Sequence, residues 1–249
     1  MKYYVTADVH GFYSEMRAAL EKAGFFSEHE PHKLIILGDL FDRGQEAVKM
    51  QAFVSQLMAE DRVILVRGNH EDLYMDLVLQ DEGRPLRHHM SNGTYDTVLQ
   101  LTGYTKQEAA AKPKEFAQAG RETLLYSEII PAMADYFETE HYVFVHGWVP
   151  CCKNRDGTYS YYENWREAGR YAWDEARWIN GMDAISTCME KKTIVCGHWH
   201  TSYGHSKYDG NGPEFGAGAD FSPYIAPGII ALDGCTAYSG MVNVIQIED

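Results

Sequence analysis

The chain lacks any long run of apolar residues. None of its 249 residues lies in a stretch that approaches the roughly 18 apolar residues of a membrane-spanning helix. A strand-like run follows Met1 directly, without the basic segment, apolar segment and cleavage site of a signal peptide. We therefore expect a soluble, cytoplasmic protein with no membrane partner.

Positive charge is scarce. The chain has 22 Lys and Arg residues against 36 Asp and Glu residues, which gives a formal net charge of −14. Nucleic-acid binding depends on Lys and Arg side chains that neutralise phosphates, so this balance argues against a nucleic-acid partner. A small phosphorylated compound remains compatible with it, because bound divalent cations would offset the negative charge locally.

The cysteines are too few and too irregularly spaced to form a disulfide framework. The five cysteines are Cys151, Cys152, Cys188, Cys196 and Cys235. Their odd number and irregular spacing match neither a disulfide scaffold nor a zinc knuckle. We expect reduced thiols, as in proteins of a reducing compartment.

The first third of the chain alternates strand and helix patterns. Strand-like runs at 2–7, 33–37 and 62–66 are separated by apolar residues at helical spacing in 12–23 and 46–60. This alternation predicts an α/β fold with a parallel-sheet core.

The segment at about 71–138 interrupts this rhythm. Its composition is mostly helical, with breaks that include Gly83, Gly93 and Gly103. We expect a helical, cap-like insertion within a single domain that spans 1–249.

The last third returns to strand patterns. Strand-like runs occupy 142–145, 193–196, 229–232 and 241–247, whereas 203–223 carries five Gly and two Pro and predicts a long loop or irregular hairpin.

Polar residues follow most of the expected strands. The residues at these strand ends are Asp8, Asp39, Asn69, His146 and His198. Because ligands of α/β sheets bind at the carboxyl ends of strands, we expect these side chains to meet at one point.

The chemistry of this set predicts a pair of metal ions. Carboxylate and imidazole ligands suit manganese, iron, zinc or cobalt, and not the all-oxygen sites of calcium. Paired ions about 3.5–4 Å apart clamp the attacking and leaving oxygens of an in-line displacement. Asp39, after the second strand, is the best candidate for a carboxylate that bridges both ions.

Five motifs in this order resemble a known family. They are Asp8-x-His10-Gly11, Gly38-Asp39-x-x-Asp42-Arg43-Gly44, Gly68-Asn69-His70-Glu71, Val145-His146-Gly147 and Gly197-His198-x-His200. Together they look like the signatures of the calcineurin-like metallophosphoesterases. They are most similar to the phosphoprotein phosphatase branch, with its bacterial serine/threonine phosphatases and symmetrical diadenosine tetraphosphate hydrolases. The resemblance implies a four-layer α/β/β/α sandwich of two mixed sheets.

The resemblance also implies a ligand set. Metal one would take Asp8, His10 and Asp39, and metal two would take Asp39, Asn69, His146 and His198. A histidine at the position of His200 binds metal one in the broader superfamily, so His200 is either a seventh ligand or a residue outside the ligand set that faces the substrate. Two divalent ions are expected, with manganese foremost and iron, zinc or cobalt as alternatives.

Residues beside the ligands supply the expected catalytic groups. His70 follows a ligand directly, so it is our candidate general acid, and Asp42 would hold its imidazole or, alternatively, cap the helix that follows. Arg43 and Arg67 would bind the phosphoryl group, because a guanidinium matches two phosphate oxygens.

Related phosphatases use a further arginine between the last two motifs. Arg177 is our candidate for this role, with Arg170 and Arg155 as alternatives.

The leading functional prediction is hydrolysis of phosphomonoesters, either phosphoserine and phosphothreonine in proteins or small phosphorylated metabolites. A hydroxide that bridges the metals would attack phosphorus in line. A symmetrical dinucleoside polyphosphate hydrolase is the alternative, followed by a small phosphodiesterase.

Residues 91–97 loosely resemble a stretch that borders the active site in bacterial relatives. The aromatic-rich stretch at 159–178 either packs in the core or stacks on a base.

Overall fold

The first sheet is built from the strands that the N-terminal third predicts. The computed structural model describes residues 1–80 and 84–249. Three parallel strands, β1 (Lys2–Thr6), β2 (His32–Leu37) and β3 (Val63–Val66), lie side by side, and β11 (Ile245–Glu248) pairs antiparallel with β1. The predicted parallel core is confirmed.

The second sheet comes from the last third of the chain. Its order is β4 (Phe137–Glu138), β5 (Tyr142–Phe144), β8 (Thr193–Cys196), β10 (Ile229–Ala231) and β9 (Tyr224–Ala226), with β5, β8 and β10 parallel. The short edge strands β4 and β9 were not predicted, because two or three residues are too few to show an alternating pattern.

An apolar layer joins the two sheets face to face. It consists of Tyr3, Val5, Ala7, Ile35, Leu37, Val66, Phe144, Val195, Leu232 and Ile247, all of them buried. Side chains alternate along a strand, so the neighbours of these residues point to the outer faces. Both faces of each sheet are therefore covered.

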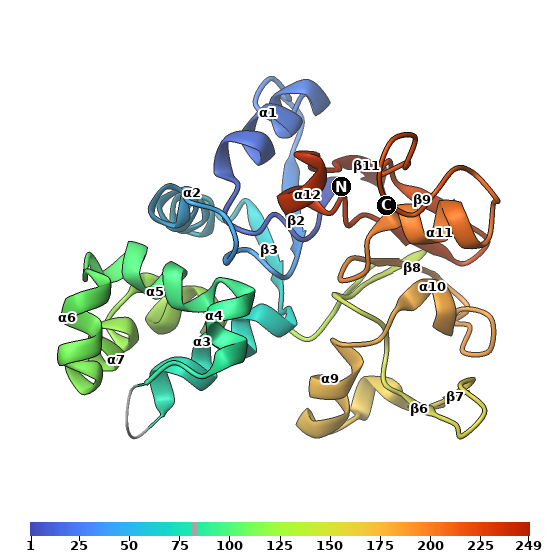
Figure 1. Ribbon diagram of the computed structural model, residues 1–249. Coiled ribbons are helices and arrows are strands. Elements are labelled where there is room, and N and C mark those ends of the chain that lie inside the picture. Colours follow the sequence, from blue (N-terminus) through green and yellow to red (C-terminus); the bar gives the residue numbers. More distant parts are fainter. Residues whose placement is uncertain (81–83) are drawn as a thin grey trace.

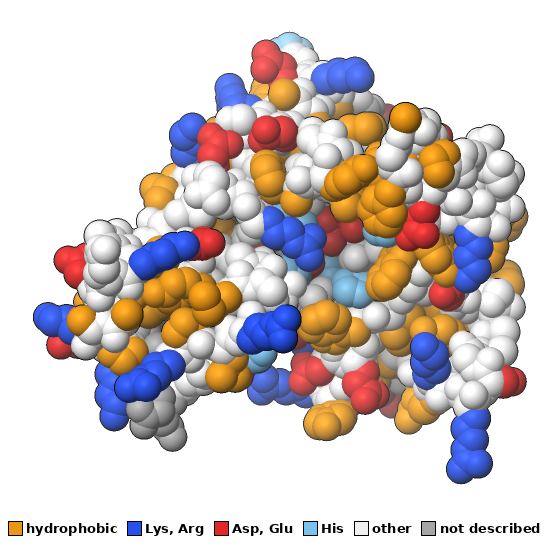
Figure 2. Space-filling view, viewed as in Figure 1, with side chains coloured by type: hydrophobic (Ala, Val, Ile, Leu, Met, Phe, Trp, Pro, Cys, Tyr) orange, Lys and Arg blue, Asp and Glu red, His pale blue; other side chains and the backbone are white. Residues whose placement is uncertain are grey.

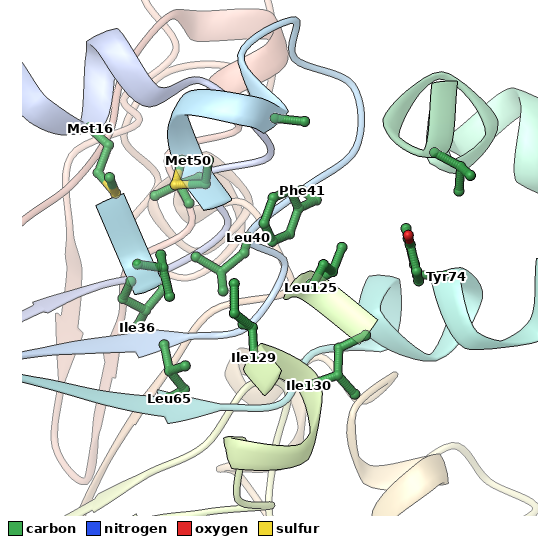
Figure 3. Packing of buried hydrophobic residues seen from close by; sticks show 14 of the residues in the cluster. Met16, Ile36, Leu40, Phe41, Met50, Leu65, Tyr74, Leu125, Ile129 and Ile130 are labelled. Carbon is green, nitrogen blue, oxygen red and sulfur yellow. The ribbon is translucent and has the colours of Figure 1, made fainter. Parts of the chain in front are cut away.

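Helices cover the outer faces. Met16 of α1 (Tyr13–Ala23) and Met50 of α2 (Ala47–Ala59) pack on Ile36 and Leu65 outside the first sheet (Figure 3). Residues of α9 (Arg170–Ala176) and α10 (Gly181–Ala184) pack outside the second. The resulting α/β/β/α layers, visible in Figure 1, confirm the expected sandwich.

A bundle of helices follows β3. Its members are α3 (Asn69–Leu79), α4 (Arg87–Asn92), α5 (Thr94–Thr102), α6 (Lys106–Ala111), α7 (Pro113–Arg121), the π-helix η1 (Leu125–Ile129) and α8 (Ile130–Ala132). The bundle stands to one side of the sheets (green in Figure 1), with Leu125 and Ile129 between the first sheet and Tyr74 (Figure 3). Gly93 and Gly103, both with positive φ, end α4 and α5 as predicted, and the break predicted at Gly83 lies outside the described residues.

The remaining elements lie in the connections that follow β5, β8 and β10. They are the hairpin β6 (Cys151–Lys153) and β7 (Tyr159–Tyr161), the 3-10 turn η2 (Trp165–Glu167), α11 (Thr201–Lys207) and α12 (Thr236–Ser239). The prediction of a loop at 203–223 is wrong for its first residues, which continue α11 because Ser202, Gly204 and His205 are buried against the protein.

The five cysteines are free thiols. No helix in the described ranges is long and apolar enough to cross a membrane.

The layer between the sheets predicts a pair of contrasting variants. Ile35→Ala removes a fully buried side chain from this layer and should lower the free energy of unfolding by about 2–5 kcal/mol, because the cavity cannot close. Ile225→Ala is the matched control, since that side chain is 67% exposed in edge strand β9, and it should change the value by less than about 0.5 kcal/mol. Urea denaturation measures both, and equal losses would contradict this packing.

Candidate metal centre

The two sheets bring their polar strand ends to one cavity. The side chains that line it include His10, Asp39, Arg43, Asn69, His70, His198, His200 and Asp233, around a volume of about 280 Å³. Figure 2 shows histidine and acidic side chains in a hollow near the centre of this face. Three of the five predicted strand-end residues, Asp39, Asn69 and His198, therefore meet at this cavity.

Asp39 lies between two groups of imidazoles. Ligand atoms of Asp39, His10 and His70 lie within 4.8 Å of one another, and so do those of Asp39, His146 and His198. One carboxylate oxygen, Oδ2, is 3.7 Å from Nε2 of His10, and the other, Oδ1, is 3.4 Å from Nε2 of His146. Asp39 is thus the residue that the two groups share.

Backbone carbonyls fix the orientation of two of these imidazoles. Nδ1–H of His10 donates to the carbonyl of Phe41 at 3.0 Å, and Nδ1–H of His146 donates to the carbonyl of Leu37 at 2.7 Å. Such hydrogen bonds put the lone pair of each ring on Nε2, an arrangement typical of metal-ligating histidines.

These lone pairs face a carboxylate, which makes the site fit a cation. Burial lowers the pKa of both His10 and His146, so the rings are neutral near pH 7. The Nε2 lone pairs of His10 and His146 face the Asp39 carboxylate with no proton between them. A metal ion can accept electron pairs from all of these atoms. Arg43 supplies a cationic donor at one of these atoms, with Nη1 2.8 Å from Nε2 of His10.

Asp8, Asn69 and His198 are the remaining predicted ligands of the two metal ions. Oδ2 of Asp8 accepts the backbone N–H of His198 at 2.8 Å. Oδ1 of Asn69 lies 2.8 Å from Nε2 of His146 and 3.0 Å from Nδ1 of His198. Burial raises the pKa of Asp8 well above its usual value, and the nearby charges of Asp233 and Asp39 raise it further. A divalent cation would remove this repulsion.

Strained backbone presents several of these side chains. The non-glycine residues with positive φ include Asp8, His10, Asp39, Asp42, Arg43 and His198. Such conformations cost about 1–3 kcal/mol each and gather at functional sites. Sequence patterns do not reveal them, so the loop geometry was not predictable.

Glu71 anchors the loop of Asp39. Its buried carboxylate accepts the backbone N–H groups of Asp39, Leu40 and Gly68 at 2.8–3.0 Å. Burial, and then the Asp39 charge, raise the pKa of Glu71 to about 7. The sequence contained Glu71 in a motif but gave it no role, because its hydrogen bonds join two distant segments.

The predicted dyad of Asp42 and His70 is present as a contact. Nδ1–H of His70 donates to Oδ2 of Asp42 at 2.7 Å, and the hydroxyls of Thr94 and Thr97 donate to the two oxygens of the same carboxylate. Burial lowers the pKa of His70, but the Asp39 and Asp42 carboxylates outweigh it and leave the pKa raised. The alternative role of Asp42 as a helix cap is wrong, because Glu46 is the N-cap of α2.

Of the candidate arginines, only Arg43 is among the described residues that line the cavity. Nη2 of Arg67 pairs with Oδ1 of Asp72 at 2.6 Å, and Nε of Arg177 pairs with Oδ2 of the same carboxylate at 2.8 Å. Arg177 also pairs with Asp135 and Asp174. The structure thus places Arg67 and Arg177 in an ion-pair network instead of at the cavity.

The two alternative arginines also lie elsewhere. Nε of Arg170 is 3.7 Å from Asp174, and Arg155 is exposed in the turn between β6 and β7.

His200 lines the cavity but stands apart from both imidazole groups. Its Nδ1 is 3.0 Å from the hydroxyl of Ser202, and its Nε2 is 3.2 Å from the carboxylate of Glu214. Both ring nitrogens therefore have partners, one in α11 and one in the loop after it, and the role of His200 as a ligand stays a prediction.

Comparison with known proteins identifies the class. The family model of the calcineurin-like phosphoesterases matches residues 1–217. The chain belongs to this family, as its motifs predicted. The family uses a dinuclear centre of divalent metal ions, and the described residues provide candidate ligands for one.

Curated relatives match part of the chain. An asymmetrical bis(5'-nucleosyl)-tetraphosphatase, PrpE, of Bacillus subtilis is 29% identical over 133 residues, which are 51% of this chain and 52% of the relative. A symmetrical bis(5'-nucleosyl)-tetraphosphatase of Photorhabdus laumondii is 41% identical over 73 residues, 28% of this chain and 24% of that protein. The chain thus spans about half the length of the first of these relatives.

Solved structures share the fold. A cold-active protein-tyrosine phosphatase of a psychrophilic Shewanella superposes with a TM-score of 0.56 at 16% identity, covering 100% of this chain and 75% of that one. A putative diadenosine tetraphosphatase gives 0.50 at 14% identity, with 100% and 94% covered.

Gly68 provides a test of how tightly the centre is packed. A Cβ at this position would lie 2.2 Å from Oδ1 of Asp39 and 2.5 Å from its backbone nitrogen. Gly68→Ala should therefore lower stability by about 1–3 kcal/mol and reduce Mn²⁺ binding, because Asp39 must shift. Gly169→Ala is the control, since a Cβ there meets nothing within 4 Å. Calorimetry and metal analysis check both, and normal Mn²⁺ content in Gly68→Ala would show that the contact is unimportant.

Proposed function

We propose that this chain is a phosphoesterase that depends on two metal ions. The observation that carries the proposal is the Asp39 carboxylate, whose two oxygens face His10 on one side and His146 on the other at 3.7 and 3.4 Å. A carboxylate placed between two sets of neutral nitrogen donors suits a bridge between two cations. Membership of the calcineurin-like phosphoesterase family supports the same function.

The residues for each ion follow from this division. Asp8, His10 and Asp39 would hold one ion, and Asp39, Asn69, His146 and His198 would hold the other. Manganese is the foremost candidate for this mixed nitrogen and oxygen set, with iron, zinc or cobalt as alternatives. When bound, the ions activate water as the nucleophile and stabilise charge on the phosphoryl group.

The protein groups around the ions act on the substrate. Asp42 holds Nδ1 of His70 at 2.7 Å, which leaves Nε2, now 3.2 Å from Nη2 of Arg43, as the atom that would give a proton to the leaving oxygen once the guanidinium binds the phosphoryl group. The guanidinium of Arg43, beside Nε2 of His10 and of His70, is the donor that holds phosphoryl oxygens. Thr94 and Thr97 keep the Asp42 carboxylate in place.

We also propose that the chain is one domain, 1–249, in which the helical segment at about 71–138 is an insertion that completes the site. Asn92 lines the cavity, and Thr94 and Thr97 hold Asp42, so this segment contributes directly to the catalytic dyad. The free thiols are in keeping with a cytoplasmic location.

Phosphomonoesters are the substrate class that the cavity supports best. Its volume of about 280 Å³, and Arg43 as the one arginine among the described residues that line it, suit a single phosphoryl group, on a phosphoprotein or on a small metabolite. Small phosphodiesters are a lesser alternative, and the formal charge of −14 disfavours nucleic acid.

A second candidate is the hydrolysis of dinucleoside polyphosphates. Trp178 and Trp199 line the cavity and remain 54% and 38% exposed, so their rings are available to stack on a nucleobase. The names of the curated relatives, bis(5'-nucleosyl)-tetraphosphatases, favour the same class.

The general acid can be tested by the leaving group of the substrate. His70→Ala should lower kcat for phenyl phosphate about 10²–10⁴-fold, because the phenoxide then departs unprotonated. The loss for p-nitrophenyl phosphate should be much smaller, since its leaving group needs no proton, and Mn²⁺ content should stay normal. His29→Ala, at an exposed position, is the control. Equal losses on the two substrates would remove the assignment.

Substitution of Trp178 distinguishes the two candidate substrate classes. If a base stacks there, Trp178→Ala should raise KM for diadenosine tetraphosphate by about ten-fold, in line with stacking energies of 1–3 kcal/mol, and leave p-nitrophenyl phosphate unaffected. Tyr171→Ala, in which an 81% exposed ring is removed from α9, should change neither. An unchanged KM for diadenosine tetraphosphate would leave phosphomonoesters as the favoured class.

A further inference from the structure

A buried carboxylate beside the centre has no role in the mechanism above. Asp233 follows β10 closely, just as His146 follows β5 and His198 follows β8 in the same sheet. Its side chain lines the cavity, and the residue is only 6% exposed. Three neighbouring parallel strands therefore each send one metal-ligating type of side chain to the same edge.

The Asp233 side chain is fixed by its loop. Oδ1 accepts the backbone N–H of Cys235 at 2.7 Å, and Cys235 has a φ of +52°. The backbone carbonyl of Asp233 accepts the N–H of Thr201, and the hydroxyl of Thr236 donates to the carbonyl of Asp8 at 3.2 Å. The loop is thus tied to the Asp8 strand end, and the carboxylate cannot turn to solvent without breaking these bonds.

The carboxylate also lacks a cation of its own. Within residues 1–80 and 84–249, no Lys, Arg or His nitrogen forms an ion pair with Asp233, whereas buried charges in proteins are normally paired or bind metals. Its electrostatic neighbours include Asp8 and Asp39, which are also buried carboxyl groups, and Arg43. A divalent ion held by Asp8 and Asp39 would offset two of the three negative charges that these carboxylates can carry, and Arg43 lies near enough to lower the pKa of Asp233.

We propose that Asp233 is a further ligand of the metal centre, and that its second carboxylate oxygen binds the ion held by Asp8, His10 and Asp39. This inference rests on the proposed function, because it requires that the ions bind. It explains why a carboxylate is kept in a buried position beside two others. It also gives the first ion a third carboxylate, whereas the second ion has three neutral donors, Asn69, His146 and His198, besides Asp39.

The test is Mn²⁺ binding by the whole chain, measured by titration calorimetry on metal-free protein. Asp233→Asn keeps the shape and the hydrogen bond to Cys235 but removes the charge, and Asp233→Ala removes the oxygen. Each should weaken one of two Mn²⁺ sites by more than the roughly 10–100-fold that loss of an outer-shell partner costs, and leave the other unchanged. Asp61→Asn is the control, since its 89% exposed side chain precedes β3, at the opposite end of the strand from the cavity.

Thermal stability supplies a second readout that needs no activity. Saturating Mn²⁺ should raise the Tm of Asp233→Asn less than that of the wild type, because the variant holds one of the two ions more weakly. A lower Tm with both Mn²⁺ affinities unchanged would show a structural role only and overturn the proposal. Wild-type protein that binds no Mn²⁺ would instead overturn the proposed function itself.

Discussion

The Asp39 carboxylate is the contact through which the two sheets act as one site. It follows β2 in the first sheet, yet Nε2 of His146 from the second sheet lies 3.4 Å from one of its oxygens. The apolar layer between the sheets sets the distance between these strand ends. Packing and chemistry are therefore coupled, because a shift of one sheet against the other would separate the two imidazole groups that share Asp39.

The loops around Asp39 contain backbone conformations that are unfavourable in an isolated chain. Asp39 has φ of +52°, and Gly38 and Gly68 approach so closely that a Cβ on either would lie 2.5 Å or less from a neighbouring atom. Glu71 offsets part of this strain with three backbone hydrogen bonds. The sandwich thus provides rigid strands, and buried polar bonds hold the strained turns that aim the ligands.

Periodicity predicted the regular elements well, and motifs predicted the centre. The strands at the sheet centres were found because each is a run of buried residues, and the ligands were found because they follow those runs. The ion-pair network of Arg67, Asp72 and Arg177 was not predictable, because it joins Asp72 of α3 to Arg177, 105 positions away. Asp233 was missed for a similar reason, since a lone Asp after a strand carries no signal until the fold places it beside Asp8.

The account depends most directly on Asp39 as the bridge between two ions. Metal-free protein can be titrated with Mn²⁺ and the bound metal counted per chain by mass spectrometry, for the wild type and for Asp39→Asn. The account predicts two ions per chain in the wild type and loss of both in the variant, because each ion loses the carboxylate that they share. Retention of two ions in Asp39→Asn would contradict it.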